Sequence, residues 1–272
     1  MIEILKAFIL GIVEGISEWL PISSTGHMIL ADELLQLNVS TEFMNMFLVV
    51  IQLGAILAVV VLYFNKLNPF SDKKTVKQRK ATWIIWFKVI VACVPAAVIG
   101  ILFEDAIDEA LGSPYIVAAM LILYGVLFIV VENRNKDIEP RVKKFSEFTF
   151  KDALIIGALQ VLALIPGTSR SGVTIVGGIM FGMSRTIAAE FTFYLSIPVM
   201  FGASFLKLLG FGFGFTFLEV AIMFVGCVTA FFVSVITIKF FMGYIKKNDF
   251  KIFGYYRIIL GIVVFAYFLI NS

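Results

Sequence analysis

Long hydrophobic runs separated by short polar connections dominate this sequence. A helix that crosses a bilayer needs about 20 consecutive, mostly apolar residues, with a working range of about 17–25. Six runs meet this requirement, and they cover residues 43–64, 83–103, 115–131, 187–209, 217–238 and 252–270. The pattern therefore predicts an all-α integral membrane protein with six transmembrane helices.

Two further apolar stretches, residues 11–27 and 157–172, are each interrupted by a cluster of polar, glycine and proline residues. Non-helical backbone at membrane depth is tolerated only where it is buried in protein or lines a wet cavity. We therefore expect two re-entrant helical hairpins whose tips line a cavity, and not two additional spans.

The two interrupted stretches also resemble each other. One fixed offset brings four pairs into register, namely Gly11 with Gly157, Glu14 with Gln160, Ser23 with Ser169 and Gly26 with Gly172. Three predicted spans follow each stretch, and an odd number of crossings places the second hairpin on the opposite face of the membrane. This arrangement is an inverted-topology repeat, which is expected to hold its site at the interface between the repeats.

The charges of the connections give an orientation. Loops 65–82 and 132–151 carry six basic residues each and loop 239–251 carries four, whereas 104–114 and 210–216 carry none. Because cytoplasmic loops are enriched in Lys and Arg, the three basic loops are predicted to be cytoplasmic and both termini to lie outside. The chain is predicted to be a single polytopic domain, 1–272. Its halves, about 1–132 and 150–272, are joined by the cytoplasmic loop 132–151.

Composition agrees with a membrane protein and excludes several function classes. The chain is 60% hydrophobic and 15% charged, whereas soluble domains average about 45–50% apolar and about 25% charged residues. A water-soluble enzyme, a DNA-binding module and a disordered tail are therefore excluded. A net charge of +3 is too small to indicate a nucleic-acid partner, so we expect no nucleic acid. The hydrophobic composition instead predicts membrane lipid around the chain.

The first interruption begins with two acids. Glu14 and Glu18 are four residues apart, so they share one face of a helix. A buried carboxylate is costly unless it is paired, protonated or bound to a metal, and hard oxygen ligands suit Mg²⁺ or Ca²⁺. We expect this pair to be a metal site; a solvated helix face near the membrane surface is the alternative.

A turn with the sequence PISSTGH follows the acids at residues 21–27. Pro21 stops the helix, Gly26 allows close approach of the backbone, and a new helix is expected to start near residue 27, capped by the hydroxyls of Ser23, Ser24 and Thr25. The positive end of that helix would hold an anion. His27 is the only histidine and suits proton transfer at neutral pH, although a structural role is the alternative.

The second interruption, PGTSRSGVT, contains an arginine in an apolar stretch. Such an arginine is costly and usually functional, and the planar guanidinium of Arg170 matches phosphate oxygens. An anion cradle is expected from the residues around it, namely Gly167, Thr168, Ser169, Ser171 and Thr174. A snorkelling arginine at the cytoplasmic face is the alternative. Together, the acids, hydroxyls, histidine and arginine of the two hairpins predict phosphoryl transfer.

The segments EGISEWLPISSTGH and PGTSRSGVT resemble the two signature motifs of the bacterial undecaprenyl-diphosphate phosphatase family, the bacitracin-resistance type of integral membrane phosphatase. The likeness extends to IQLGAILAVV at 51–60 and AAEFTFYLSIP at 188–198. The resemblance implies hydrolysis of the C55 prenyl diphosphate to the monophosphate with a divalent cation, which recycles the lipid carrier for cell-wall synthesis in the bacterial plasma membrane.

Roles for individual residues follow from the same resemblance. Glu14 and Glu18 look like the family's acidic pair and Ser24 like its nucleophile or phosphate ligand. His27 looks like its essential histidine and Arg170 like its phosphate-binding arginine. The family site opens toward the outer side of the membrane.

Several alternatives stay open at this point. The nucleophile is Ser24, His27 or a water, with His27 as the base in the first case. A transporter or flippase for a phosphorylated prenyl lipid is the rival function, because inverted repeats with broken helices are typical of transporters. The choice between Mg²⁺ and Ca²⁺, the accepted chain length and homodimer formation are also left open by the sequence.

Overall fold

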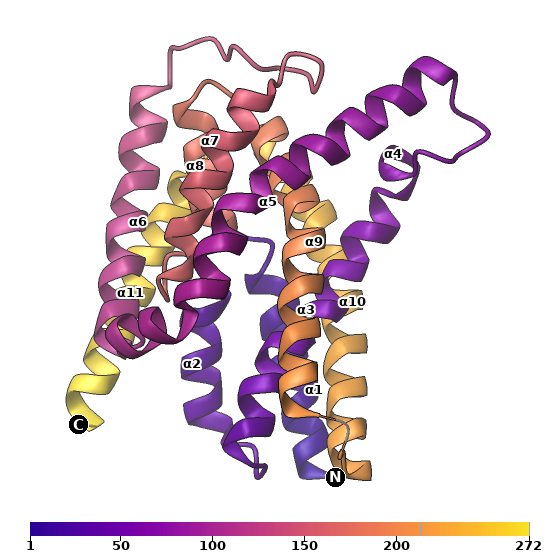
Figure 1. The fold of residues 1–272 in the computed structure, drawn as a ribbon. Coiled ribbons are helices and arrows are strands. Elements are labelled where there is room, and N and C mark those ends of the chain that lie inside the picture. Colours follow the sequence, from indigo (N-terminus) through magenta and orange to yellow (C-terminus); the bar gives the residue numbers. More distant parts are fainter. Residues whose placement is uncertain (213, 272) are drawn as a thin grey trace.

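The computed structural model describes residues 1–212 and 214–271, with the side chains of residues 104 and 105 excepted. The described part of the chain consists of helices joined by loops (Figure 1). The elements are α1 (Ile2–Ser17), α2 (Ser24–Leu35), α3 (Thr41–Leu62), α4 (Phe64–Leu67), α5 (Val76–Leu111), α6 (Pro114–Arg134), α7 (Phe150–Gln160), the 3₁₀ turn η1 (Val161–Leu164), α8 (Arg170–Met180), α9 (Arg185–Phe211), α10 (Phe217–Ile245) and α11 (Lys251–Asn271).

Six of the described helices are long and apolar enough to cross a membrane, which confirms the six predicted spans. They are α3, α5, α6, α9, α10 and α11. The largest difference is α5, whose 36 residues extend beyond the predicted 83–103 and include most of the predicted loop 104–114. The helix begins early because Thr75, its N-cap, forms a capping box with Gln78 in its first turn.

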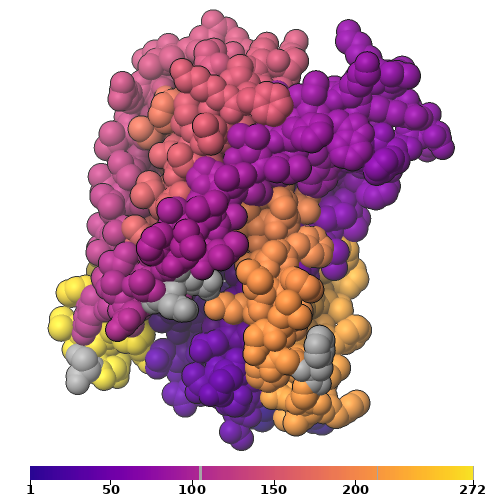
Figure 2. Space-filling model, viewed as in Figure 1, coloured from indigo at the N-terminus to yellow at the C-terminus, as the bar shows by residue number. Residues whose placement is uncertain are grey.

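The connections between the helices separate by charge. In Figure 1 the three basic stretches, 65–82, 132–151 and 239–251, lie at one end of the bundle, and both termini lie at the other. This is the arrangement that the loop charges predict. The last stretch is shorter as a loop than predicted, because α10 continues to Ile245. Figure 2 shows α4 and the first turns of α5 projecting from the body of the molecule at the basic end.

Two helical hairpins approach each other from opposite ends of the bundle (Figure 1). The α1–α2 hairpin comes from the end that holds the termini, and the α7–η1–α8 hairpin comes from the basic end. The two hairpins are in direct contact. The Ser171 hydroxyl donates a hydrogen bond to the Glu18 carbonyl oxygen at 3.3 Å. The two hairpins are the elements that the interrupted stretches predict; their re-entrance into a bilayer stays a prediction.

The packing partners of the hairpins also correspond. α1 packs on α10, and α7 packs on α5. A Cβ atom at Gly11 would lie 2.7 Å from the Gly226 carbonyl oxygen, and one at Gly157 would lie 2.4 Å from that of Ala92. The aligned glycines therefore serve the same purpose, close helix–helix approach. This correspondence supports the inverted repeat, which stays a prediction.

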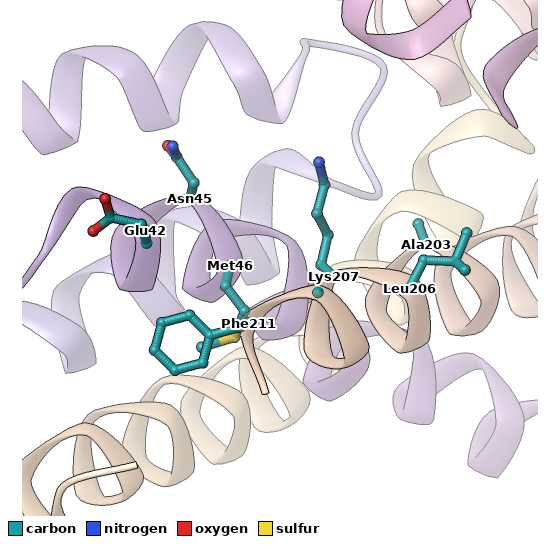
Figure 3. Close-up of a pocket in the computed structure, with 8 residues that line it drawn as sticks. Glu42, Asn45, Met46, Ala203, Leu206, Lys207 and Phe211 are labelled. Atoms are coloured by element: carbon teal, nitrogen blue, oxygen red, sulfur yellow. The ribbon is translucent and has the colours of Figure 1, made fainter. Parts of the chain in front are cut away.

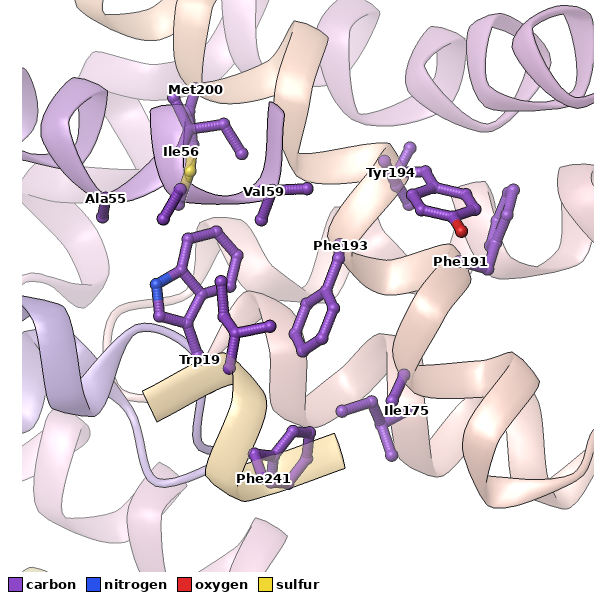
Figure 4. Packing of buried hydrophobic residues seen from close by; sticks show 14 of the residues in the cluster. Trp19, Ala55, Ile56, Val59, Ile175, Phe191, Phe193, Tyr194, Met200 and Phe241 are labelled. Carbon is purple, nitrogen blue, oxygen red and sulfur yellow. The ribbon is translucent and has the colours of Figure 1, made fainter. Parts of the chain in front are cut away.

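A buried aromatic cluster lies next to the meeting point of the hairpins (Figure 4). Trp19, directly after Glu18, is fully buried and meets Phe193 of α9 edge-to-face, with 5.3 Å between ring centroids. Phe193 in turn contacts Phe241 of α10. Close packing of large rings resists small displacements, so the first hairpin is held firmly against α9 and α10.

Candidate active site

The two hairpin turns share an unusual backbone geometry. Ser23 has φ 71° and ψ 103°, and Ser169 has φ 70° and ψ 117°. Each serine is an N-cap whose hydroxyl accepts the backbone N–H of the third residue on, at 3.4 Å from Gly26 and 3.1 Å from Gly172. Positive φ is costly for residues other than glycine and persists only where the surroundings enforce it. Both turns are therefore strained in the same way.

The cap at Ser23 corrects the predicted start of the second helix. α2 begins at Ser24 and not near residue 27. Ser23 alone serves as the cap, because its hydroxyl accepts the Gly26 N–H, whereas Ser24 and Thr25 lie in the first turn. Thr25 is exposed.

Glu18 joins the two turns. Its Oε1 accepts from Nη2 of Arg170 at 2.8 Å, and its Oε2 accepts from the Ser24 hydroxyl, also at 2.8 Å. The Glu18 and Arg170 side chains are only 8% and 12% exposed. Charge-assisted hydrogen bonds of this kind are strong and directional, so Glu18 fixes Ser24 on one side and Arg170 on the other.

Arg170 is also held by α9. Its Nη1 donates to the Thr192 carbonyl at 3.1 Å. The Thr174 hydroxyl donates to the Arg170 carbonyl at 2.8 Å and lies 2.8 Å from the Thr192 hydroxyl. Thr174 therefore docks α8 on α9. Two of the five N–H donors of the guanidinium are used by these contacts with Glu18 and Thr192.

The other predicted cradle residues lie around this centre. The Ser169 and Ser171 hydroxyls are 3.2 Å apart, and Ser171 bonds the first hairpin. Gly167 and Thr168 are buried, and the Thr168 hydroxyl has no hydrogen-bond partner among the described residues. A buried unpaired hydroxyl is costly, which suits a position that receives a ligand oxygen.

His27 lies in the first turn of α2 and has partners other than Ser24 and Glu18. Its Nδ1 is 2.8 Å from the Ser23 carbonyl oxygen and its Nε2 is 2.7 Å from the Tyr256 hydroxyl, while the two rings stack with centroids 5.6 Å apart. A carbonyl only accepts, so Nδ1 carries a proton, and in the neutral ring Nε2 accepts from Tyr256. The hydrogen-bond acceptor of the Ser24 hydroxyl is Glu18 and not His27.

Glu14 fits a cation. It is 1% exposed, and its Oε1 has no hydrogen-bond partner among the described residues. It interacts electrostatically with Glu18 and Arg170. Among the described residues, no group of three or more His, Cys, Asp or Glu is placed to hold a metal. Two carboxylates are nevertheless the usual protein share of a Mg²⁺ site that substrate phosphates complete.

Sequence reasoning missed the contributions of α9 and α11. Arg257 is a charged residue inside the apolar run 252–270, a signal that was available. It is fully buried beside both turns. No pattern distinguishes Thr192 or Tyr256 from the other polar residues in the spans, because only the packed fold brings them to Arg170 and His27.

One cavity lies away from these residues. The pocket in Figure 3, with a volume of about 430 Å³, is formed between the start of α3 and the end of α9. Glu42, Asn45 and Lys207 are its polar residues. None of the residues around Glu18 lines this pocket, so it is separate from the candidate site.

The fold and the site define a polytopic α-helical membrane protein with a buried acid, hydroxyl and arginine between two helical hairpins. The family model described as bacitracin resistance protein BacA matches residues 7–263. The chain belongs to this family.

Individual relatives agree over nearly the whole length. A protein named undecaprenyl-diphosphatase from Desulfitobacterium hafniense is 62% identical over 98% of this chain and 97% of its own. Proteins of the same name from Acetivibrio thermocellus and Enterococcus faecalis are 62% and 58% identical. The alignment with the first protein covers 99% of this chain and 99% of that protein, and the alignment with the second covers 98% of each.

Proposed function

We propose that the protein is an integral membrane phosphatase that hydrolyses undecaprenyl diphosphate to undecaprenyl phosphate and inorganic phosphate. The hydrogen-bonded series Arg170–Glu18–Ser24 between the two turns carries this proposal, because it combines a phosphate-binding cation with an activated hydroxyl. The family match and the names of the relatives support the substrate. The activity recycles the lipid carrier for cell-wall synthesis and confers bacitracin resistance.

The contacts support Ser24 as the nucleophile. Its hydroxyl attacks the terminal phosphorus, its proton passes to Oε2 of Glu18, and the bond from phosphorus to the bridging oxygen breaks. The monophosphate lipid leaves with that oxygen, and water then hydrolyses the phosphoserine. Arg170, fixed through Glu18 and Thr192, stabilises the charge that develops on the phosphoryl oxygens.

Trapping of the intermediate tests this route. Acid quench during turnover should leave labelled phosphate on Ser24, and Ser24→Ala should abolish the label. Turnover with no trapped phosphoenzyme in rapid quench would contradict nucleophilic attack by Ser24 and assign attack to His27 or water.

A divalent cation, Mg²⁺ or Ca²⁺, is part of the proposal. Glu14 and Glu18 would hold it, and the unpartnered Oε1 of Glu14 supports this placement. When bound, the ion supplies charge neutralisation for the diphosphate. Glu14→Gln should raise the metal concentration needed for half-maximal activity by at least about tenfold, as loss of one carboxylate ligand weakens a hard-cation site. An unchanged metal titration would remove Glu14 from the ligand set.

The loop charges and the family match support a location for the chain and an open face for the site. We place the chain in the bacterial plasma membrane with its basic connections in the cytoplasm, and the α1–α2 hairpin therefore starts from the outer side. This orientation supports a site that opens to the outer face, with the prenyl chain running between helices into lipid. Labelling of single cysteines in loop 36–40 of intact cells tests the orientation, and loop 36–40 accessible only from the cytoplasm would contradict it.

The activity itself is tested by phosphate release. Purified protein in detergent should release inorganic phosphate from undecaprenyl diphosphate, and EDTA should abolish the release. No release from folded protein would contradict the proposal and favour the transporter alternative, which lipid flipping in vesicles would then test.

A further inference from the structure

Arg257 is the most deeply buried charged side chain that the described site does not yet explain. It lies on α11 with 0% exposure, and its guanidinium lies 5.7 Å from the ring centre of Tyr124. Its hydrogen bonds among the described residues run to backbone carbonyls. A buried cation is costly unless its surroundings compensate it, so these carbonyls are the partners that keep Arg257 in place.

The carbonyls belong to both hairpin turns. Nη1 donates to the Pro21 carbonyl at 3.4 Å, and Nη2 donates to the carbonyls of Gly167 and Thr168, each at 2.9 Å. Arg257 therefore bridges two turns that start from opposite ends of the bundle (Figure 1).

Nη1 and Nη2 of Arg257 bind carbonyls at corresponding positions of the two turns. The offset that aligns Ser23 with Ser169 also aligns Pro21 with Gly167. Each of these carbonyls lies two residues before a serine with φ near +70°. The strained conformation needs support from its surroundings, and one planar fork supplies that support to both turns at once.

From this geometry we propose that Arg257 is a positioning residue for the phosphatase reaction, which makes this inference rest on the proposed function. It sets the separation of the two turns, and thereby the distance from Ser24 and Glu18 on the first hairpin to Arg170 on the second. Arg257 acts through the backbone of the turns and makes no contact with substrate.

The consequence is a specific kinetic signature. Arg257→Lys keeps the charge but presents one compact ammonium in place of a two-pronged fork, so it cannot hold both turns in register. A displacement of about 1 Å at a catalytic centre costs about 100-fold in rate, and we expect kcat to fall by about that factor. KM should change little, because Arg170 and the hydroxyls that bind phosphate are still present.

Two further variants separate positioning from folding. Arg257→Ala opens a space of guanidinium size, and added guanidinium should restore part of kcat, whereas His27→Ala should gain nothing. Arg185→Lys is the matched control, since Arg185 pairs with Glu132 away from the turns; it should keep normal kcat. Thermal unfolding in detergent reports the folded state of each variant.

Each contrary outcome has a clear meaning. Normal kcat in Arg257→Lys, or folded Arg257→Ala without guanidinium rescue, would overturn the proposal. A raised KM with unchanged kcat would also overturn it and make Arg257 a direct substrate ligand. Loss of folded protein in both variants would overturn it in favour of a scaffold role. If wild-type protein releases no phosphate, the proposed function fails instead, so the two failures are distinguishable.

Discussion

The turns at Ser23 and Ser169 have nearly the same backbone but carry different chemistry. In both, a serine at positive φ caps a helix and accepts the N–H of a glycine three residues later. The residue after the cap is Ser24 in the first turn and Arg170 in the second, and both side chains bond the same carboxylate, that of Glu18.

The histidine position shows the same division. His27 aligns with Val173 in the second hairpin, so only the first turn carries a histidine. One structural device, used twice, therefore places the Ser24 hydroxyl on one side of Glu18 and the Arg170 guanidinium on the other. The proposed reaction requires both turns, and single substitutions on either side should reveal their dependence on each other.

Glu18→Gln should have the largest effect, because among the described residues Glu18 alone bonds both Ser24 of the first turn and Arg170 of the second. The amide cannot accept the Ser24 proton as a carboxylate does, and Arg170 loses its buried counter-charge. Loss of a general base costs about 10²–10⁴ in rate, and we expect kcat to fall about 10³-fold in phosphate-release assays. A loss below tenfold would mean that Ser24 has another base.

Arg170→Lys should follow with a loss of about 100-fold in kcat, because an ammonium cannot reproduce two diverging N–H bonds and a planar phosphate contact. In the structure Nη1 and Nη2 reach Thr192 and Glu18 respectively. The variant should be almost as impaired as Arg170→Ala. Near-normal turnover of the lysine variant would reduce Arg170 to a point charge.

Tyr256→Phe should lower kcat less, because Tyr256 contacts only His27 of the first hairpin among the described site residues. The phenyl ring can still stack on His27, but the hydrogen bond to Nε2 is lost. One hydrogen bond contributes about 1 kcal/mol, which corresponds to about a fivefold fall in kcat. An unchanged kcat would indicate that the Ser23 carbonyl alone orients the imidazole.

Ser23→Ala and Ser169→Ala should have the smallest effect. Each should lower the stability of the fold slightly, and by nearly the same amount. Each removes one helix cap, which costs about 1 kcal/mol, and both positions have the same backbone conformation. Thermal unfolding should show matching decreases in melting temperature. A decrease at only one position would show that the turns are not equivalent.

The sequence predicts the fold well because the bilayer imposes a simple length and hydropathy pattern. The six spans and the two interrupted hairpins follow from that pattern alone. The start of α5 was harder to predict, because a capping box at Thr75 extends the helix into a charged segment. The same applies to α2, where the cap at Ser23 moves the helix start upstream of residue 27.

The candidate site was predictable in content but not in connectivity. The motifs contain Glu18, Ser24 and Arg170, but spacing along one chain cannot show that Glu18 bonds the other two. The partner of His27 comes from α11, more than two hundred residues away in the sequence. Contacts of this kind depend on tertiary packing, which leaves no local pattern in the chain.

A double-mutant cycle on Glu18 and Arg170 tests most directly the central claim that the two turns form one catalytic unit. If the two turns act as one unit, Glu18→Gln combined with Arg170→Lys should lose about 10³-fold in kcat, close to Glu18→Gln alone, because the effects of residues that act as a unit are strongly non-additive. Multiplication of the two single effects, to about 10⁵-fold, is the result for independent residues. That result would contradict a shared site.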